Sequence, residues 1–587
     1  MPDVRDTYRL PADSDRPEPP NLDAQRRTRP RVTGRQVTTR RLIGALVLVV
    51  PLVWALGRAL PVGHDIVNRG GARLIGDLLG QALSPRLDGD FLRLVLEATG
   101  TTLAFAAIGT AGALVIGLLG GLVLSDVAWT HRPPRTVRAV RVVLRGLLVA
   151  TRSIHELVWA LLLVSVLGLD PLVAVLAIAL PFGAQTAQVF GDTFDGLPTS
   201  ALHSLRNAGA TTMPAVAFAL LPPASPLMLS YAFYRFECAV RSTVLLGAVG
   251  VGGLGQELVV SLSSRNWDEV WTLIAAVIIV SALVDAWSGR LRADMAVASC
   301  SEWSAGAAPE PPGGVAPRRS RSRWARWSAL AIIPGLVAAW LASGVSLSGL
   351  TSSRTRALTG GLVEDLLPPK LPAGGWSVVG DAVLDTLAMA VVAMAIAVLI
   401  TVVIAPWAVT TRAQGGAPGS LPARIARRMA WALARIGLLV LRSVPPTVWA
   451  VIALLALFPG ILPGALALGV YTGGVLGRLV AESWESVSPV PRNALLRSGV
   501  PGALATLAAV VPASAHQLLT YTLYRFEICV RETAVVGIVG AAGLGRLLSE
   551  NLNLFRFPVV STLLIASFAV SVSSELLSRR LRRAIRA

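Results

Sequence analysis

The stretch LAFAAIGTAGALVIGLLGGLVLS, residues 103–125, carries no charged side chain. A helix needs about 20 mainly apolar residues to cross roughly 30 Å of hydrocarbon, so this stretch is long enough to span a membrane. Further runs of about 20 or more mainly apolar residues occupy 41–63, 382–407 and 431–458. The sequence therefore predicts an all-α polytopic membrane protein.

The composition agrees with this class. Of the 587 residues 53% are hydrophobic, and the formal net charge is +19, with a mean hydropathy of +0.63. A membrane protein combines these properties because its loops hold the charge while its spans hold little. Nucleic-acid binding would also explain a basic chain, but the arginines cluster in short segments between apolar runs. That pattern favours topology signals.

We expect about 12 transmembrane helices, six in each half. Those of the first half are predicted near residues 42–63, 92–125, 142–168, 170–190, 222–248 and 268–287. Those of the second half are predicted near residues 327–345, 381–408, 430–458, 460–481, 512–538 and 558–577.

Polar segments divide the chain into four parts. Residues 1–40 are rich in Pro, Asp and Arg and predict a disordered cytoplasmic tail. The first module is predicted over 41–289, a Pro- and Gly-containing linker over 290–326, and the second module over 327–587.

Arginine-rich segments predict the topology. They lie in the tail, in the loop 132–141, in the linker, in the loop 412–428 and at the C-terminus. Short basic loops favour the cytoplasm, and an even number of spans in each half places all five segments on that side. Both termini are then cytoplasmic in the cell membrane, and the two halves have the same orientation.

The two halves repeat each other at a constant offset of 290 residues. The segment YAFYRFECAVRSTVLLGAVGVGGLG (231–255) matches YTLYRFEICVRETAVVGIVGAAGLG (521–545), and RSIHELVWA (152–160) matches RSVPPTVWA (442–450). Farther upstream, Thr102 matches Thr386 at an offset of 284. Repeats of equal orientation predict pseudo-twofold symmetry about an axis along the membrane normal, with a pathway lined by both halves.

The fifth span of each half carries the candidate pathway residues. Helical spacing places Tyr234, Glu237 and Arg241 on one face, with Arg235 on another. The equivalent residues of the second half are Tyr524, Glu527, Arg531 and Arg525.

Charged side chains at membrane depth are costly unless they are paired or hydrated. The functional interpretation is a pathway for a small anion, in which arginines attract the anion and tyrosines donate hydrogen bonds to it. The structural interpretation is an i,i+4 ion pair that stabilises the helix bundle. We favour the structural role for the two glutamates, and both interpretations stay open for the arginines.

Glycines follow the charged segment at matching positions. They are Gly247, Gly250, Gly253, Gly255, Gly537, Gly540, Gly543 and Gly545. The first copy contains a formal G-x-G-x-x-G, but no βαβ context surrounds it and the second copy has Ala542 at the middle glycine, which excludes a dinucleotide site. Close helix packing is favoured for these glycines over a gating hinge.

A duplicated Gly–Pro pattern lies between the fourth and fifth spans, on the predicted cytoplasmic side. Gly209 and Gly499 precede Pro222 and Pro512 by the same spacing. Here the chain resembles the coupling segment of ABC-importer permeases, which in that family is a short helix that docks on the ATPase. The Glu that is usual in that segment is missing from both copies.

The repeated segments resemble more specifically the permease subunit of phosphonate-class ABC importers, which take up phosphonate, phosphite or phosphate. The resemblance rests on RSIHELVWA, on YRFE followed by VR, and on the glycine-rich segment; the second copy lacks the equivalent of Glu156. It implies two fused tandem ABC-importer permease (MetI-like) bundles that work by alternating access.

The same resemblance implies the partners: two copies of a cytoplasmic ABC ATPase and an extracytoplasmic substrate-binding protein, in addition to membrane lipid. The chain itself contains no G-x-x-x-x-G-K-[ST], so ATP is expected to be hydrolysed by the partner. We predict no directly bound cofactor and no nucleic-acid partner.

Two other classes of membrane protein are alternatives to this interpretation. A secondary active transporter with two same-orientation repeats would also have about twelve spans, but it would need neither an ATPase nor a duplicated Gly–Pro segment. A membrane-embedded enzyme would need convergent catalytic residues, whereas the repeated charges are arginines and glutamates without a nucleophile. Cys238, Cys300 and Cys529 have no zinc-site spacing and predict no metal site.

Overall fold

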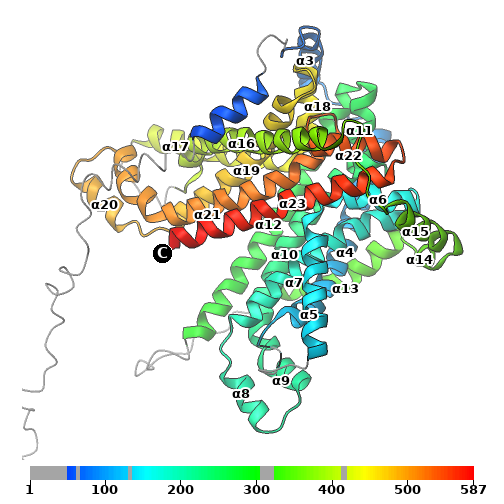
Figure 1. The fold of residues 1–587 in the computed structure, drawn as a ribbon. Coiled ribbons are helices and arrows are strands. Elements are labelled where there is room, and N and C mark those ends of the chain that lie inside the picture. The colour runs from blue at the N-terminus through cyan, green and yellow to red at the C-terminus, as the bar shows by residue number, and fades with distance from the viewer. Residues whose placement is uncertain are drawn as a thin grey trace, which may run out of the picture. The chain divides into compact units, whose positions relative to one another are not determined.

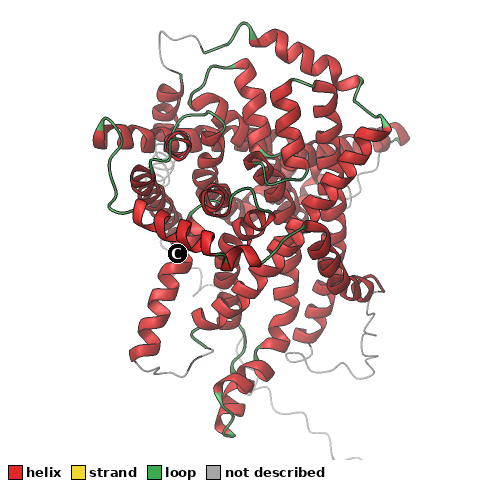
Figure 2. Ribbon diagram, turned by 90° about the vertical axis from the view of Figure 1, so that its right-hand side faces the viewer, coloured by secondary structure: helices red, strands yellow, loops and turns green. Residues whose placement is uncertain are grey.

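The computed structural model describes residues 49–60, 66–127, 129, 135–304, 323–410 and 420–586. Within these ranges the protein consists of helices and loops, as Figure 2 shows, apart from one isolated antiparallel bridge between Val67 and Leu457. From Trp54 onward the chain forms one compact unit. The predicted tail and residues 305–322 of the predicted linker lie outside the described residues.

The first half begins with the apolar helix Val49–Ala59. It continues with α3 (Gly71–Gly80), η2 (Gln81–Leu83), α4 (Gly89–Leu124), α5 (Arg135–Ser153), α6 (Glu156–Leu167), α7 (Pro171–Asp195), α8 (Ser200–Asn207), α9 (Thr212–Ala219), α10 (Leu221–Leu246), η3 (Gly247–Val249), α11 (Leu254–Ser264) and α12 (Trp267–Ser304).

The second half contains α13 (Arg323–Ser343), α14 (Ser348–Thr351), α15 (Ser353–Asp365), α16 (Gly375–Ala408), α17 (Leu421–Ser443), α18 (Pro446–Ala456), α19 (Ile461–Ser486), α20 (Val490–Arg497), α21 (Gly502–Ile538), α22 (Leu544–Asn553) and α23 (Phe557–Arg586).

The two halves repeat the same order of helices (Figure 1). From α4 to α8 the first half corresponds to α16 to α20 of the second, α10 to α21, α11 to α22, and α12 to α23. In both halves the most extensive helix pair is the equivalent one, α4 with α7 and α16 with α19. The repeat in the sequence is therefore a repeat of the fold.

Among the described residues, seven helices are long and apolar enough to cross a membrane, and ten spans result if each of three bent pairs counts as one. These ten coincide with ten of the twelve predicted spans. The other two fall on shorter apolar helices, Val49–Ala59 and Leu330–Ser343. Helix α12 continues past residue 290 to Ser304 because that segment contains helix-forming Arg, Ala and Met and no Gly or Pro after Gly289.

The third span of each half, predicted as one continuous helix, is sharply broken. The bend is 98° between α5 and α6 and 90° between α17 and α18. In the first half His155 starts a new helix, since its side chain accepts a hydrogen bond from the Leu157 N–H at 3.3 Å. In the second half Pro445 and Pro446 take the equivalent positions, where proline suits a helix start.

Small residues allow the main helix pairs to approach closely. A Cβ atom on Gly117 of α4 would lie 2.3 Å from the Thr186 side chain of α7, and a Cβ atom on Gly473 of α19 would lie 2.9 Å from the Ile400 side chain of α16. Because lipid is as apolar as a leucine side chain, such close backbone approach is a main source of helix association in membranes.

The two modules pack on each other reciprocally. Val158 of α6 belongs to the apolar cluster of Leu544 and Leu548 on α22. Its counterpart Val448 of α18 belongs to the cluster of Leu254 and Leu258 on α11. Each module therefore contributes the segment after its bend to the core of the other, and this exchange creates the interface at which the cavity lies.

An ion-pair cluster fixes the start of α4. The Asp88 carboxylate caps the helix by accepting from the Phe91 N–H at 3.2 Å, and Arg86 donates to it at 2.6 Å. The hydrogen bond from Arg86 holds the pKa of the Asp88 carboxyl below its ordinary value. Arg86 also contacts Glu269 at 2.7 Å, which ties α4 to the start of α12.

Candidate functional site

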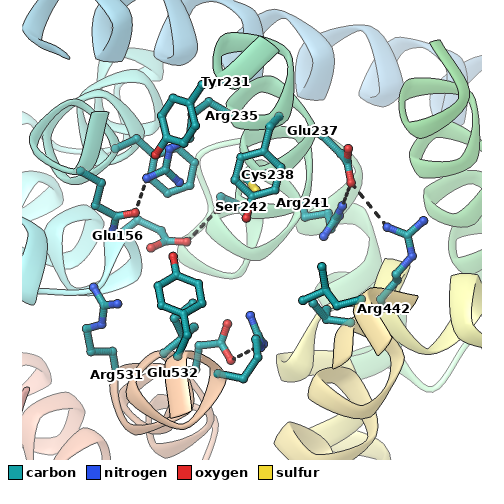
Figure 3. A pocket seen from close by; sticks show the side chains of 18 of the residues that line it. Glu156, Tyr231, Arg235, Glu237, Cys238, Arg241, Ser242, Arg442, Arg531 and Glu532 are labelled. Carbon is teal, nitrogen blue, oxygen red and sulfur yellow. Dashed lines mark hydrogen bonds and ion pairs between the residues drawn. The ribbon is translucent and has the colours of Figure 1, made fainter. Parts of the chain in front are cut away.

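A cavity of about 650 Å³ lies between the two modules. Its wall comes from α5, α6, α7, α10 and α12 of the first module and from α17, α18, α19 and α21 of the second. The charged residues that line it are Arg152, Glu156, Arg235, Glu237, Arg241, Arg292, Arg442, Arg478, Glu482, Arg525, Arg531 and Glu532. Figure 3 shows seven of them converging from the helices of both modules, namely Glu156, Arg235, Glu237, Arg241, Arg442, Arg531 and Glu532.

Seven of the eight predicted pathway residues line this cavity. They are Tyr234, Arg235, Glu237, Arg241, Tyr524, Arg525 and Arg531. Glu527 does not line it; it is buried beside Arg531 at 3.5 Å. Arg235, which helical spacing places on a different face from Arg241, also reaches the cavity because a broad face of α10, from Leu227 to Leu245, forms the wall.

Glu237 is the centre of the largest ion-pair network. It pairs with Arg241 on the same helix, with Arg292 at 3.4 Å, with Arg442 at 3.5 Å and with Arg478 at 3.7 Å. Its side chain is only 6% exposed. A buried carboxylate needs such partners, so the contacts of Glu237 support the structural interpretation of this residue.

Two reciprocal ion pairs join the modules. Arg442 of α17 pairs with Asp285 of α12, and Arg152 of α5 pairs with Glu575 of α23 at 2.6 Å. The two pairs are related by the offset of 290 residues. The two arginines lie in the repeated segments that predicted the cavity, whereas Asp285 and Glu575 lie outside those segments and were not predicted, although both positions of the repeat are acidic.

Arg235 is the lining arginine that has no carboxylate partner among the described residues. It donates to the Gln185 side chain, and its guanidinium lies 4.5 Å from the Phe182 ring centroid and 5.4 Å from that of Tyr231. Its Nε is buried without a hydrogen-bond partner in the described part of the chain. The site therefore holds a cation whose charge is balanced by no carboxylate of the described residues.

Arg525, the counterpart of Arg235, has different surroundings. It lies 3.4 Å from the Thr472 hydroxyl, 3.6 Å from the Glu532 carboxylate and 5.9 Å from the Tyr471 ring centroid. Its Nε, too, is buried without a partner among the described residues. Only the second module thus supplies this arginine with an acidic neighbour.

Each module carries one carboxylate in this part of the cavity, but at non-equivalent positions of the repeat: Glu156 in the first module and Glu532, the exchanged carboxylate, in the second. In the first module Glu156 at the start of α6 accepts from the Ser242 hydroxyl of α10 at 2.7 Å. The equivalent positions of the second module hold Pro446 and Glu532, and both line the cavity. The glutamate that the second copy lacks at 446 is therefore matched by a glutamate at 532, which a comparison of single aligned positions does not reveal.

Tyrosines contribute hydroxyl groups to the same cavity. Tyr231, Tyr234, Tyr471 and Tyr524 all line it. Tyr234 is 42% exposed and Tyr524 is 46% exposed, although both lie within long apolar helices. Their exposure is toward the cavity, so these phenols can donate hydrogen bonds to a solute there.

The glycines after the fifth spans allow close backbone contacts. A Cβ atom on Gly247 would lie 2.5 Å from the Gly255 Cα, and one on Gly537 would lie 2.7 Å from the Gly545 Cα. Thr102 accepts from the Leu254 N–H at 2.9 Å and Thr386 accepts from the Leu544 N–H at 3.0 Å. The same hydrogen bond thus forms in both modules, between a threonine repeated at an offset of 284 and a leucine repeated at an offset of 290. This geometry supports close packing, and not a hinge, as the role of the glycines.

The glycines between these pairs adopt backbone conformations with positive φ: Gly250 (85°), Gly252 (108°) and Gly253 (81°) in the first module, and Gly540 (118°) and Gly543 (95°) in the second. L-residues rarely adopt these conformations, so the turn between each fifth span and the next helix depends on glycine in both modules.

The predicted coupling segments contain the short helices α8 and α20. After α8, the Gly209 N–H donates to the Arg206 carbonyl and the next N–H to the Leu205 carbonyl, both at 3.0 Å. Gly499 ends α20 in the same way. The two glycines have φ of 87° and 81°, so each ends its helix in a Schellman motif.

The prolines that follow have unequal consequences. In the first module the helix breaks at Leu220, with a 63° bend between α9 and α10, and Pro222 lies in the first turn of α10. In the second module α21 continues through Pro512. Pro512 therefore lies inside the helix and not at its start.

The described residues contain no group of three or more His, Cys, Asp and Glu side chains that could hold a metal ion. Cys238 lines the cavity as a free thiol, and Cys529 is a free thiol in the core. The side chain of Cys300 lies outside the described part of the chain.

Comparisons with known proteins agree with this architecture. Residues 117–297 match the family described as binding-protein-dependent transport system inner membrane component. The phosphate-import permease protein PhnE of Mycolicibacterium smegmatis is 28% identical over 86% of this chain and 88% of its own length. The phosphite transport system permease protein PtxC of Stutzerimonas stutzeri is 33% identical over 37% of this chain and 76% of its own length.

A shorter relative is the putative cryptic phosphonate transport system permease protein PhnE2 of Escherichia coli K12, 36% identical over 20% of this chain and 97% of its own length. The Mycolicibacterium relative thus extends over both modules, whereas the other two match a part that a single module could provide. This chain therefore belongs to the inner-membrane permease family of binding-protein-dependent ABC importers, and it carries two permease modules in one polypeptide.

Proposed function

We propose that this chain moves a small oxyanion, namely phosphonate, phosphite or phosphate, inward across the cell membrane by alternating access. The observation that carries the proposal is the cavity between the modules, which eight arginines and four glutamates line. The printed names of the relatives, which refer to phosphate, phosphite and phosphonate, support the same chemical class.

The energetics of the membrane support an anion as the solute. An ionisable side chain within a bundle is expensive and normally faces a water-filled cavity or a partner. Arg235 has no carboxylate partner among the described residues, and the Nε atoms of Arg235, Arg525 and Arg531 are buried without hydrogen bonds. A tetrahedral oxyanion presents several acceptor oxygens, and it would satisfy such donors and balance the charge.

The residues have distinct proposed roles. Arg235 and Arg525 bind the anion, Arg241 and Arg531 attract it, and the Tyr234 and Tyr524 hydroxyls donate hydrogen bonds to it. Glu237 and Glu527 keep arginines in place. Each of these residues except Glu527 lines the cavity.

The partners in this proposal are two copies of a cytoplasmic ABC ATPase and an extracytoplasmic substrate-binding protein. The ATPase binds α8 and α20 and hydrolyses ATP, while this chain binds no cofactor and is not an enzyme. The Schellman glycines support these helices as docking elements, because they redirect the chain immediately after eight-residue helices in both modules. Both termini are cytoplasmic in this arrangement.

The test is uptake of radiolabelled phosphate by proteoliposomes that contain the chain with its co-purified ATPase and binding protein. We expect uptake that depends on ATP, and Arg235→Gln should lower it about 10- to 100-fold, the usual effect of losing hydrogen bonds to a charged group. Arg546→Gln is the control, because Arg546 is half-exposed on α22 and pairs with Glu550.

Two results would contradict the proposal. Uptake by the chain alone, driven by a proton or sodium gradient, would indicate a secondary transporter. Undiminished uptake by a double variant with Arg235→Gln and Arg525→Gln would remove these arginines from the pathway. Size-exclusion chromatography of each variant shows whether the complex still assembles.

A further inference from the structure

The exchanged carboxylate gives the cavity an acceptor as well as donors. Glu532 is 9% exposed, and its Oε2 has no hydrogen-bond partner in the described part of the protein. The nearest cation is Arg525, whose guanidinium lies 3.6 Å from that oxygen. Figure 3 shows the Glu532 side chain directed toward the same space as Glu156 of the opposite module.

The first module satisfies its carboxylate differently. Glu156 accepts from the Ser242 hydroxyl at 2.7 Å. Glu532 has no such hydroxyl beside it, since Pro446 takes the position opposite. The unmet acceptor of the cavity therefore belongs to the second module.

We propose that Glu532 makes this cavity select oxyanions that carry a proton, such as hydrogen phosphate, over oxyanions that carry none, such as sulfate. This inference rests on the proposed function, because it concerns the same cavity and the same anion. In it, the arginine N–H groups bind the charged oxygens of the anion, and the Glu532 carboxylate accepts the hydrogen bond that the P–OH group donates.

The chemistry of the anions supplies the selectivity. Inorganic phosphate has three ionisable hydroxyl groups and loses at most two of their protons near neutral pH, so hydrogen phosphate still carries one P–OH group. Sulfate has lost both protons at neutral pH and presents only acceptor oxygens. Opposite Glu532 it would leave the carboxylate without a donor and would place two negative groups together, and both effects oppose binding.

The charged and titratable side chains around Glu532 lie on its own helix and in the α5–α6 region. They are Arg525 and Arg531 on α21, His155 in the α5–α6 bend and Glu156 on α6. None of these side chains donates a hydrogen bond to Oε2. The anion is thus the group that would complete this acceptor.

The test measures binding of inorganic phosphate and of sulfate to the full-length chain purified in detergent, by competition against radiolabelled phosphate. We expect wild-type protein to prefer phosphate. Glu532→Gln keeps the size of the side chain but adds an N–H donor that suits sulfate, so the ratio of the phosphate and sulfate affinities should fall about 10- to 100-fold, the range for a charged hydrogen bond. Glu532→Asp retains the carboxylate and should retain the preference.

The control is Glu550→Gln, on the half-exposed Arg546–Glu550 pair of the same module, and it should leave the ratio unchanged. An unchanged ratio in Glu532→Gln protein that still binds phosphate would overturn the inference and leave the proposed function intact. If wild-type protein bound neither anion, both the inference and the proposed oxyanion pathway would be contradicted.

Discussion

Glu237 and Glu527 are equivalent in the repeat, yet they have different partners. Glu237 contacts four arginines, two of them from the other module. Glu527 contacts Arg531 at 3.5 Å and makes no other ion pair within the described ranges. One cause is Arg478, which lies 3.3 Å from Asp285 and 3.7 Å from Glu237, whereas its counterpart in the first module is Gln188.

The difference shows that the two modules share their backbone structure more fully than their cavity charges. The helix order, the Thr102 contact and its Thr386 counterpart, and the Schellman glycines recur in both modules. The cavity charges recur only in part. Because one chain encodes each module separately, a charge can change in one module without its equivalent, and the cavity becomes asymmetric within a symmetric frame.

The largest effect should come from breaking the network of Glu237. Glu237→Gln leaves several arginines without their shared carboxylate, and removing one partner of a buried ion pair costs about 3–5 kcal/mol. Glu527→Gln removes one contact to a charged group and should cost less, about 1.5–3 kcal/mol. The measurement is thermal unfolding of the two variants in the same detergent.

Equal losses of stability would show that the asymmetry of the ion pairs has no energetic consequence. Gln188→Arg provides the complementary test, since it adds to the first module the arginine that the second already has. We expect it to reduce the difference between the two glutamate variants.

The fold was predictable because its signals are long. Runs of twenty apolar residues and a constant repeat offset predicted the helical class, the two modules and the positions of ten spans. The bends were not predicted, because the runs 142–168 and 430–458 are mainly apolar on both sides of the break. The local signals were the polar residues up to His155 and Glu156 in the first half and the Pro445–Pro446 pair in the second.

The site residues were predictable where the same residue recurs in both modules. They were not predictable where a charged residue is present at only one of two equivalent positions. Arg235, Arg241 and their counterparts recur at one offset, and the cavity includes them all. Glu532 replaces Ser242 in the repeat, so its relation to Glu156 appears only when α6 and α10 are seen to touch. Arg478 replaces a glutamine and gave no repeat signal at all.

A smaller effect should follow from moving the exchanged carboxylate. Glu532→Ser alone gives α21 the residue that α10 has and removes the acceptor, so the preference for phosphate over sulfate should fall about tenfold. Adding Pro446→Glu places a glutamate at the first residue of α18, as Glu156 is at the first residue of α6. The double variant recreates the satisfied Glu156–Ser242 pair of the first module, so it should not recover the preference in the same competition assay. Recovery would mean that any carboxylate in this part of the cavity, and not an unpaired one, decides selectivity.

The smallest effect concerns the glycines that end α8 and α20. A Cβ atom on Gly209 or Gly499 would meet nothing within 4 Å, so alanine costs only the strain of a positive φ, about 1 kcal/mol. Gly437→Ala, within α17 and equally uncrowded, is the matched control without positive φ and should not impair coupling. We expect Gly209→Ala and Gly499→Ala to lower the phosphate transported per ATP hydrolysed by a few-fold, and asparagine to impair coupling less because it tolerates the left-handed conformation. Equal effects of alanine and asparagine would point to contact with the partner instead of backbone geometry, and a difference between Gly209 and Gly499 would extend the asymmetry of the cavity to the docking helices.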